Sequence, residues 1–292
     1  MKKLFLIIAT LILSSFIFAS VSNVTTRQID TQLSLLTFNS SYISGAENIN
    51  IITPANYATT SINFPTLYLL HGWSGSYQNW VQLYGRQIEA LATQYQMIIV
   101  MPDGGYASWY LNSPINPKSQ YQSLIALDCV PLIDKTYKTL PYANKRAITG
   151  LSMGGFGALA LAGNYPNLFG AAGAMSGGVE LSYAGSMDPS GNNFGINQVL
   201  GNDTSTWKKY DIINYLPVYA KNNTALILND GTSDIFIKIN RELNQAMLDA
   251  NIPHDYTESP GAHTWSFWTN AINYQTLFFS RYFQFGNTQG IY

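Results

Sequence analysis

Residues 146–166 read RAITGLSMGGFGALALAGNYP and place one serine, Ser152, between glycines. The residues before Gly150 form a short β-prone run, and residues 155–164 favour a helix. Strand, tight turn and helix are the setting in which a G-x-S-x-G motif presents a nucleophile. The same pentapeptide also occurs in loops, where the serine only turns the chain. The flanking strand and helix favour the first alternative, so we interpret Ser152 as a nucleophile.

The two glycines of the motif support this interpretation on steric grounds. A serine whose hydroxyl projects above the sheet edge sits in a strained backbone turn with positive φ. Side chains two residues to either side would collide with the neighbouring strand or helix, and Gly150 and Gly154 remove them. The helix that begins just after Ser152 also directs free N–H groups toward any developing negative charge.

Short apolar runs alternate with helical stretches along the rest of the chain. Such runs are typical of parallel strands that are covered on both faces. The alternation predicts a doubly wound α/β fold with a mostly parallel central sheet and helices on both faces. An opening pair of strands is predicted at 27–38 and 48–53. The central strands are predicted at 66–70, 97–101, 146–149, 171–175 and 225–229, and the helices at 80–95, 121–137, 155–164, 235–250 and 265–283.

Residues 177–217 interrupt the alternation. This stretch is rich in Gly, Asn, Ser and Asp and follows a predicted central strand. Long irregular excursions of this kind are either lids or disordered insertions. We favour a lid or pocket wall, because the segment would leave the sheet at its carboxyl edge, beside Ser152.

The first 22 residues have the pattern of a signal peptide. A basic start, Met1 to Lys3, precedes an apolar run at 4–13, and small residues follow. Cleavage between Ala19 and Ser22 predicts a secreted or periplasmic protein. We expect residues 23–292 to form a single domain. An uncleaved membrane anchor is the alternative. No later run is long enough to span a bilayer, so no stable membrane insertion is expected after signal removal.

The composition argues against several classes of partner. The formal net charge is −1 and only 11% of the residues are charged, so we expect no binding to nucleic acid or to an acidic membrane surface. Cys129 is the single cysteine, so no intrachain disulfide can form. It lies in the apolar run LIALDCVPLI, which favours an inert core position. No pattern in the sequence sets an oligomeric state.

A serine hydroxyl needs a base, and the base needs an acid that fixes its tautomer. Of the three histidines, His263 fits best, because it stands in a Gly-bearing loop just before the last predicted helix. His254, at the head of a β-prone run, is the alternative. For the acid, the segment ALILNDGTSDIF offers Asp230 and Asp234, and either one could instead cap local backbone.

Two N–H groups must also face the oxyanion. The residue after the nucleophile, Met153, supplies one of them. The loop after the first central strand supplies the other, which in the segment LLHGW is Trp73, with Gly72 allowing a close approach. We expect His71, in the same loop, to be structural.

With these residues in place, the chain resembles the esterase D family of α/β-hydrolases, which includes feruloyl and acetyl xylan esterases, S-formylglutathione hydrolases and mycolyltransferases. The resemblance runs from about residue 48 to residue 282. It implies Ser152 as nucleophile, Asp234 as acid and His263 as base. The segments that carry it are YLLHGWSGSYQNW, MIIVMPDGGYASWY, residues 146–177, LNDGTSDIF and PGAHTWSFW.

The resemblance also implies the oxyanion positions Trp73 and Met153 and a pocket-lining loop, PDGG, at 102–105. Candidates for contact with the substrate are Gly72, Asp103, Trp109 and Trp265. We also expect exposed aromatic side chains from a set that suggests a sugar-bearing ligand: Tyr106, Trp109, Tyr110 and Trp207.

These expectations describe an exported serine esterase that uses no metal and no cofactor. Its substrate would be a small-molecule or polysaccharide ester, such as a feruloyl or acetyl ester of a plant polysaccharide. Two alternatives stay open at this point. One is an acyltransferase, in which a sugar hydroxyl replaces water, and the other is an inactive carbohydrate-binding relative, since a fold alone never establishes activity.

Overall fold

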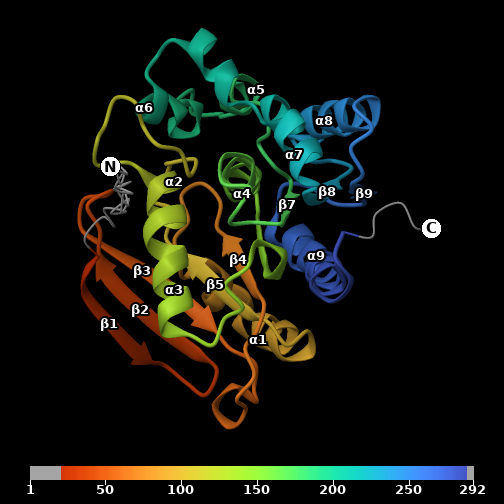
Figure 1. Ribbon diagram of the computed structural model, residues 1–292. Coiled ribbons are helices and arrows are strands. Elements are labelled where there is room, and N and C mark those ends of the chain that lie inside the picture. The colour runs from red at the N-terminus through yellow and green to blue at the C-terminus, as the bar shows by residue number, and fades with distance from the viewer. Residues whose placement is uncertain (1–20, 288–292) are drawn as a thin grey trace, which may run out of the picture.

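The computed structural model describes residues 21–287, which build one nine-stranded sheet (Figure 1). The strand order is β1-β2-β3-β5-β4-β6-β7-β8-β9. The first three strands and the β3–β5 pair are antiparallel, and every pair from β5 to β9 is parallel. The predicted mostly parallel α/β fold is therefore confirmed. The strands are β1 (Ser22–Gln28), β2 (Leu33–Asn39), β3 (Ala46–Ile52), β4 (Thr66–Leu70), β5 (Ile98–Pro102), β6 (Arg146–Gly150), β7 (Ala171–Met175), β8 (Ala225–Gly231) and β9 (Asp255–Ser259).

Helices cover both faces of the sheet, with α1 and α9 on one face and α3, α4 and α8 on the other (Figure 1). Two apolar clusters follow from this layering, because neighbouring residues of a strand point to opposite faces. In β4, Leu67 and Leu69 join the cluster under α1 and α9, and Tyr68 and Leu70 join the other cluster. The helices are α1 (Asn79–Gln94), α2 (Tyr121–Ser123), α3 (Val130–Thr136), α4 (Met153–Asn164), α5 (Leu181–Ser186), α6 (Ile196–Leu200), α7 (Leu216–Asn222), α8 (Ile237–Asp249) and α9 (Trp265–Phe285).

All residues of β4, β5, β6, β7 and β8 are buried. Their continuous apolar runs were the basis for predicting central strands, and each strand lies within two residues of its predicted bounds. Parallel strands that run in the same direction end at the same edge of the sheet. The loops that follow β4, β6 and β8 therefore meet at this edge.

The opening strands differ from the prediction. Residues 27–38 do not form one strand, because β1 ends at Gln28 and β2 begins at Leu33. The side chain of Asp30 accepts the N–H groups of Gln32 and Leu33 at 2.9 and 2.8 Å, which stabilises a turn between them. Every residue of β1 is exposed, so its sequence carries no alternation from which a strand could be predicted.

Two other segments have a secondary structure that differs from the one predicted. The predicted helix at 121–137 contains a π-helical stretch, Leu124–Cys129, between α2 and α3. Residues 177–217 are not irregular, since they fold into α5, α6, the start of α7 and several short 3₁₀ turns. Trp207 anchors this insert, because its ring is buried and its Nε1–H donates to the carbonyl oxygen of Gly201 at 3.0 Å.

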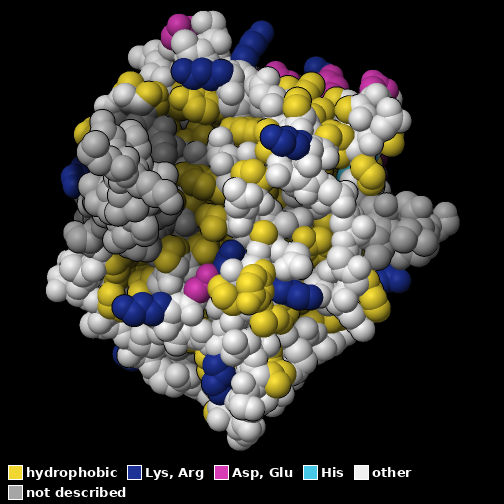
Figure 2. Space-filling view, in the orientation of Figure 1, with side chains coloured by type: hydrophobic (Ala, Val, Ile, Leu, Met, Phe, Trp, Pro, Cys, Tyr) yellow, Lys and Arg dark blue, Asp and Glu magenta, His cyan; other side chains and the backbone are white. Residues whose placement is uncertain are grey.

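Residues 1–20 of the predicted signal peptide lie outside the described residues. Within 21–287, no helix is both long enough and apolar enough to span a bilayer. Cys129 is fully buried, as predicted. On the face seen in Figure 2, Lys and Arg side chains are scattered and form no continuous basic patch.

Candidate active site

Ser152 lies in the tight turn between β6 and α4. Its φ of +56° and ψ of −118° are the strained conformation that the glycine motif predicts. A Cβ on Gly150 would lie 2.6 Å from the backbone of Gly154, and a Cβ on Gly154 would lie 2.5 Å from the carbonyl oxygen of His71. Only glycine fits at either position, so the backbone around the serine leaves no space for a side chain.

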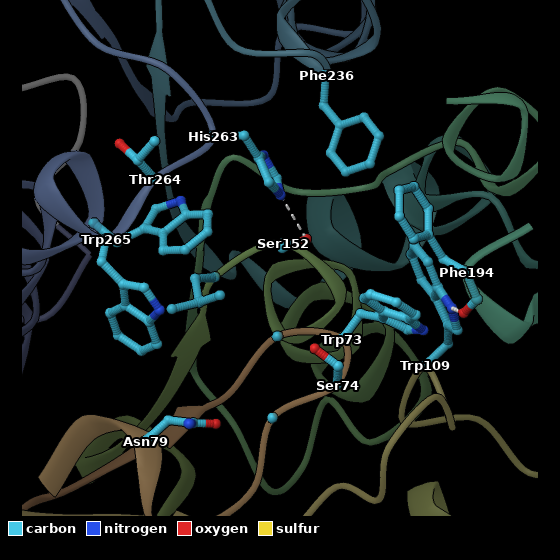
Figure 3. A pocket seen from close by; sticks show the side chains of 14 residues that line it. Trp73, Ser74, Asn79, Trp109, Ser152, Phe194, Phe236, His263, Thr264 and Trp265 are labelled. Atoms are coloured by element: carbon cyan, nitrogen blue, oxygen red, sulfur yellow. Dashed lines mark hydrogen bonds between the residues drawn. The ribbon is translucent and has the colours of Figure 1, made fainter. Parts of the chain in front are cut away.

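Ser152, His263 and Asp234 form one hydrogen-bonded chain. Figure 3 shows the bond between Ser152 and His263. The Oγ of Ser152 lies 2.9 Å from Nε2 of His263. Nδ1 of the same ring lies 3.0 Å from each carboxylate oxygen of Asp234. Because an ionised carboxylate only accepts, Nδ1 carries the proton and Nε2 is free to accept the serine proton. The residues come from three loops that meet at the carboxyl edge of the sheet.

The surroundings of Asp234 favour its charged form. Burial by itself raises the pKa of this carboxyl, but the hydrogen bonds from His263 and from the backbone N–H of Phe236 outweigh it and hold the pKa below its usual value. The rings of Phe236 and Trp268 pack against the imidazole in T-shaped contacts, with ring centroids 4.9 and 5.0 Å from its own. The ring of His263 is thus held in place by two aromatic side chains and one carboxylate.

The alternatives from the sequence lie elsewhere. Asp230 is fully buried, its carboxyl oxygens have no hydrogen-bond partner among the described residues, and burial raises its pKa well above the usual value. His254 is bound to the carbonyl oxygen of Ile252 and to the amide of Asn244. The structure therefore brings Asp234 and His263 together with Ser152. Asp230 and His254 take no part in this chain of hydrogen bonds.

The two predicted oxyanion donors both lie beside the serine. A Cβ on Gly72 would lie 3.5 Å from Cβ of Ser152, so the loop after β4 runs directly past the hydroxyl. In the described part of the chain, the backbone N–H groups of Trp73 and Met153 donate no hydrogen bond. Met153 is also the first residue of α4, where backbone N–H groups have no partner within the helix.

A pocket of about 450 Å³ opens above Ser152 and is walled largely by aromatic rings. In Figure 3, Trp73, Trp109 and Phe194 lie on one side of the serine, and Trp265 lies on the other. Gly72, Trp109 and Trp265 line the pocket as expected. The remaining lining residues were not predicted as site residues: Ser74, Gly75, Asn79, Leu151, Phe194, Phe236, Thr264 and Trp268.

Two expectations about the walls are wrong. Asp103 does not line the pocket, because its carboxylate turns back to accept the N–H of Gly105 at 2.8 Å. Of the four aromatic residues that were expected to be exposed, only Tyr106 is. Trp109, Tyr110 and Trp207 are buried, and Trp109 lines the pocket while its ring packs on Phe156, with ring centroids 5.6 Å apart.

No group of three or more His, Cys, Asp or Glu side chains within residues 21–287 is placed to hold a metal ion. The arrangement of Ser152, His263 and Asp234 can activate a hydroxyl for attack on a carbonyl carbon.

Comparison with known proteins relates this site to esterases. Esterase Rv1288 of Mycobacterium tuberculosis is 30% identical over 259 residues, which cover 80% of this chain and 56% of the relative. An acetyl esterase of Caldicellulosiruptor saccharolyticus is 29% identical over 231 residues, which cover 73% of this chain and 82% of the relative. This chain thus spans little more than half the length of the mycobacterial relative.

Solved structures show the same fold. A ferulic acid esterase matches with a TM-score of 0.73 and 24% identity, covering 87% of this chain and all of the neighbour. An S-formylglutathione hydrolase from Agrobacterium tumefaciens matches with a TM-score of 0.72 and 18% identity, covering 90% of this chain and all of the neighbour. The fold is that of the α/β-hydrolases. A profile of the family described as "Putative esterase" matches residues 40–279, and the chain belongs to this family.

Proposed function

We propose that this protein is a serine esterase that hydrolyses carboxylic esters through an acyl-enzyme. The observation that carries the proposal is the chain of hydrogen bonds from Ser152 through His263 to Asp234, at 2.9 and 3.0 Å, with Ser152 and His263 lining a pocket. Membership of the esterase family supports it.

In this mechanism, Nε2 of His263 takes the proton of Ser152 as Oγ attacks the ester carbonyl carbon. The N–H groups of Trp73 and Met153 stabilise the negative oxygen of the tetrahedral intermediate. The carbonyl re-forms, the C–O bond to the alcohol breaks, and His263 returns its proton to the leaving alcohol. Water then attacks the acyl carbon while His263 takes its proton. The bond from the acyl carbon to Oγ of Ser152 breaks, the acid leaves, and His263 returns the proton to Oγ. Asp234 holds the imidazole in the required tautomer throughout.

We further propose that the acyl group is aromatic, of the feruloyl type, and that the alcohol belongs to a plant polysaccharide or a related sugar ester. Aromatic walls on both sides of the serine suit a flat aromatic acid, because contacts between aromatic rings stabilise a complex beyond what burial of their apolar surface contributes. The fold shared with a ferulic acid esterase agrees with this choice. An acetyl group is the second candidate, because a relative is named acetyl esterase.

Export of the protein is also part of this proposal. It rests on the basic start, the apolar run and the small residues of the first 22 positions. A polysaccharide substrate outside the cell would require such export. The test expresses the full-length chain and a chain that begins at residue 23 in a host and measures where each protein is found. We expect only the full-length chain to leave the cytoplasm.

The test of the esterase proposal compares p-nitrophenyl acetate, p-nitrophenyl butyrate and methyl ferulate as substrates for the parent and for Ser152→Ala. Loss of a nucleophilic serine lowers kcat by up to about a millionfold. We expect turnover by the parent only, with kcat/KM highest for methyl ferulate. No turnover of any ester by the parent would contradict the proposal.

The same reaction mixtures distinguish hydrolysis from acyl transfer. With a sugar such as xylose added, a hydrolase releases free ferulic acid at an unchanged rate. An acyltransferase instead forms a sugar ester at the expense of the free acid. Separation of the two products by liquid chromatography therefore decides whether water is the acceptor.

A further inference from the structure

Every polar group of His71 is engaged, although the residue lines no part of the pocket. Nδ1 lies 2.8 Å from the carbonyl oxygen of Gly72, and Nε2 accepts the N–H of Gly104 at 2.7 Å. The backbone N–H and C=O of His71 both bind the hydroxyl of Tyr110 at 3.1 Å. Because Nε2 faces a donor, the proton of the neutral ring must sit on Nδ1, which donates to Gly72.

The bond to Gly72 fixes the peptide unit that carries the predicted oxyanion donor. The C=O of Gly72 and the N–H of Trp73 belong to one trans peptide and point in opposite directions. Two donors hold this carbonyl on the protein side, Nδ1–H of His71 and the N–H of Gly75 at 3.1 Å. The N–H of Trp73 is therefore directed away from the Nδ1 of His71.

The PDGG loop supports the imidazole from behind. Asp103 donates its backbone N–H to Glu47 at 2.8 Å, and its carboxylate accepts the N–H of Gly105 at 2.8 Å. These bonds hold the intervening N–H of Gly104 against Nε2 of His71. A Cβ on Gly104 would lie 2.2 Å from the ring of Tyr110, so a larger residue at position 104 would collide with this ring. The PDGG loop thus holds the imidazole of His71, which in turn holds the peptide between Gly72 and Trp73.

We propose that His71 is a positioning residue for the oxyanion hole, whose Nδ1–H holds the Gly72 carbonyl so that the N–H of Trp73 faces the developing oxyanion. This inference rests on the proposed esterase function. It changes the sequence-based view of His71 as a purely structural residue, because it predicts an effect on the transition state that is separate from substrate binding.

Two substitutions divide the contacts of the imidazole. In His71→Asn, the side-chain NH₂ takes the place of Nδ1–H and keeps the bond to Gly72. In His71→Gln, the longer side chain places its amide oxygen near Nε2, which keeps the bond from Gly104 and loses the bond to Gly72. The two variants therefore differ in the one hydrogen bond that the inference concerns.

We expect His71→Gln to lower kcat by about 10- to 100-fold with little change in KM, because loss of a whole oxyanion donor costs about 100- to 1,000-fold. His71→Asn should restore most of the parental kcat. The affinity for phenylboronic acid, which forms a tetrahedral adduct with an active serine, should fall in parallel with kcat. Equal losses of kcat in both variants, or a change in KM alone, would overturn the inference.

Failure of the proposed function looks different, because the parent itself would then turn over no ester. A second measurement does not depend on how the variants fold. The ¹⁵N chemical shifts of the His71 ring in the parent should show a protonated Nδ1 and an unprotonated Nε2. The opposite tautomer would overturn the inference, since the ring could then not donate to Gly72.

Discussion

Ser152 and Phe194 face the same pocket from two differently built regions. Ser152 and Asp234 follow the buried parallel strands β6 and β8, and His263 follows the edge strand β9. Close backbone contacts at Gly150 and Gly154 leave no space for the turn around Ser152 to change. Phe194 belongs to the insert at 177–217, whose short helices are joined by turns. The comparison teaches that the reacting groups are fixed by the sheet, whereas the shape of the pocket depends on loops that the fold leaves free to vary.

The largest effect should come from the sheet side. Asp234→Asn leaves the geometry nearly unchanged, but an amide can donate to Nδ1 and so stabilise the tautomer with the proton on Nε2, which cannot accept from Ser152. In serine proteases the corresponding change lowers kcat by about 10⁴-fold. We expect a loss of similar size, measured as kcat for p-nitrophenyl acetate.

Asp230→Asn is the matched control, because Asp230 lies near the end of β8, four residues before Asp234. Burial raises the pKa of Asp230 well above its usual value, which favours the neutral carboxyl, and an amide resembles this form in shape and charge. This variant should keep near-parental kcat. The assignment of the acid would be wrong if Asp230→Asn lost activity and Asp234→Asn did not.

A smaller and more selective effect should come from the insert side. Phe194→Ala removes an aromatic wall, and the loss of one buried ring contact costs about 1–2 kcal/mol, or roughly tenfold in affinity. We expect KM for methyl ferulate to rise by about that factor, with little change for p-nitrophenyl acetate. Ile213→Ala, an exposed residue of the same insert, should change neither value. Equal changes for both esters would mean that the wall does not select the acyl group.

The smallest effect concerns a hydrogen bond between two parts of the insert at 177–217. Asp211 accepts the N–H of Leu181 at 2.9 Å, and burial raises its pKa to about 6. The folded state therefore binds more protons than the unfolded state between about pH 4 and 6, so stability falls as the pH rises through this window. Asp211→Asn keeps the acceptor and removes the charge.

We expect this variant to be more stable than the parent at pH 7 by on the order of 1 kcal/mol, after reduction for partial exposure of the carboxyl to solvent. The advantage should shrink toward pH 4. Urea unfolding of both proteins at the two pH values gives the difference. The same pH dependence in both proteins would show that Asp211 does not titrate in this window.

The sheet side was also the more predictable from sequence. The run RAITGLSMGG encodes its own geometry, because only glycine fits on either side of Ser152. The antiparallel start was less predictable, since β1 is exposed on both faces and β2 begins only after the turn that Asp30 forms. Its strand bounds depend on pairing partners and not on a local hydrophobic pattern.

The walls of the pocket could not be read from the sequence in the same way. Phe194 lies more than forty positions after Ser152 in the chain, in a stretch without periodicity, and only the packing of the insert brings it to the serine. Asp103 has the residue type of a binding group, yet its carboxylate turns to the backbone of its own loop. Side-chain direction in such loops is set by tertiary contacts that no local pattern records.

The most direct test of the central claim is covalent labelling of the parent with an aryl fluorophosphonate, followed by mass spectrometry of the peptides. The account predicts a single adduct on the peptide that contains Ser152, absent in Ser152→Ala and strongly slowed in His263→Ala. Labelling of another residue, or unchanged labelling of Ser152→Ala, would contradict the assignment of Ser152 as the nucleophile.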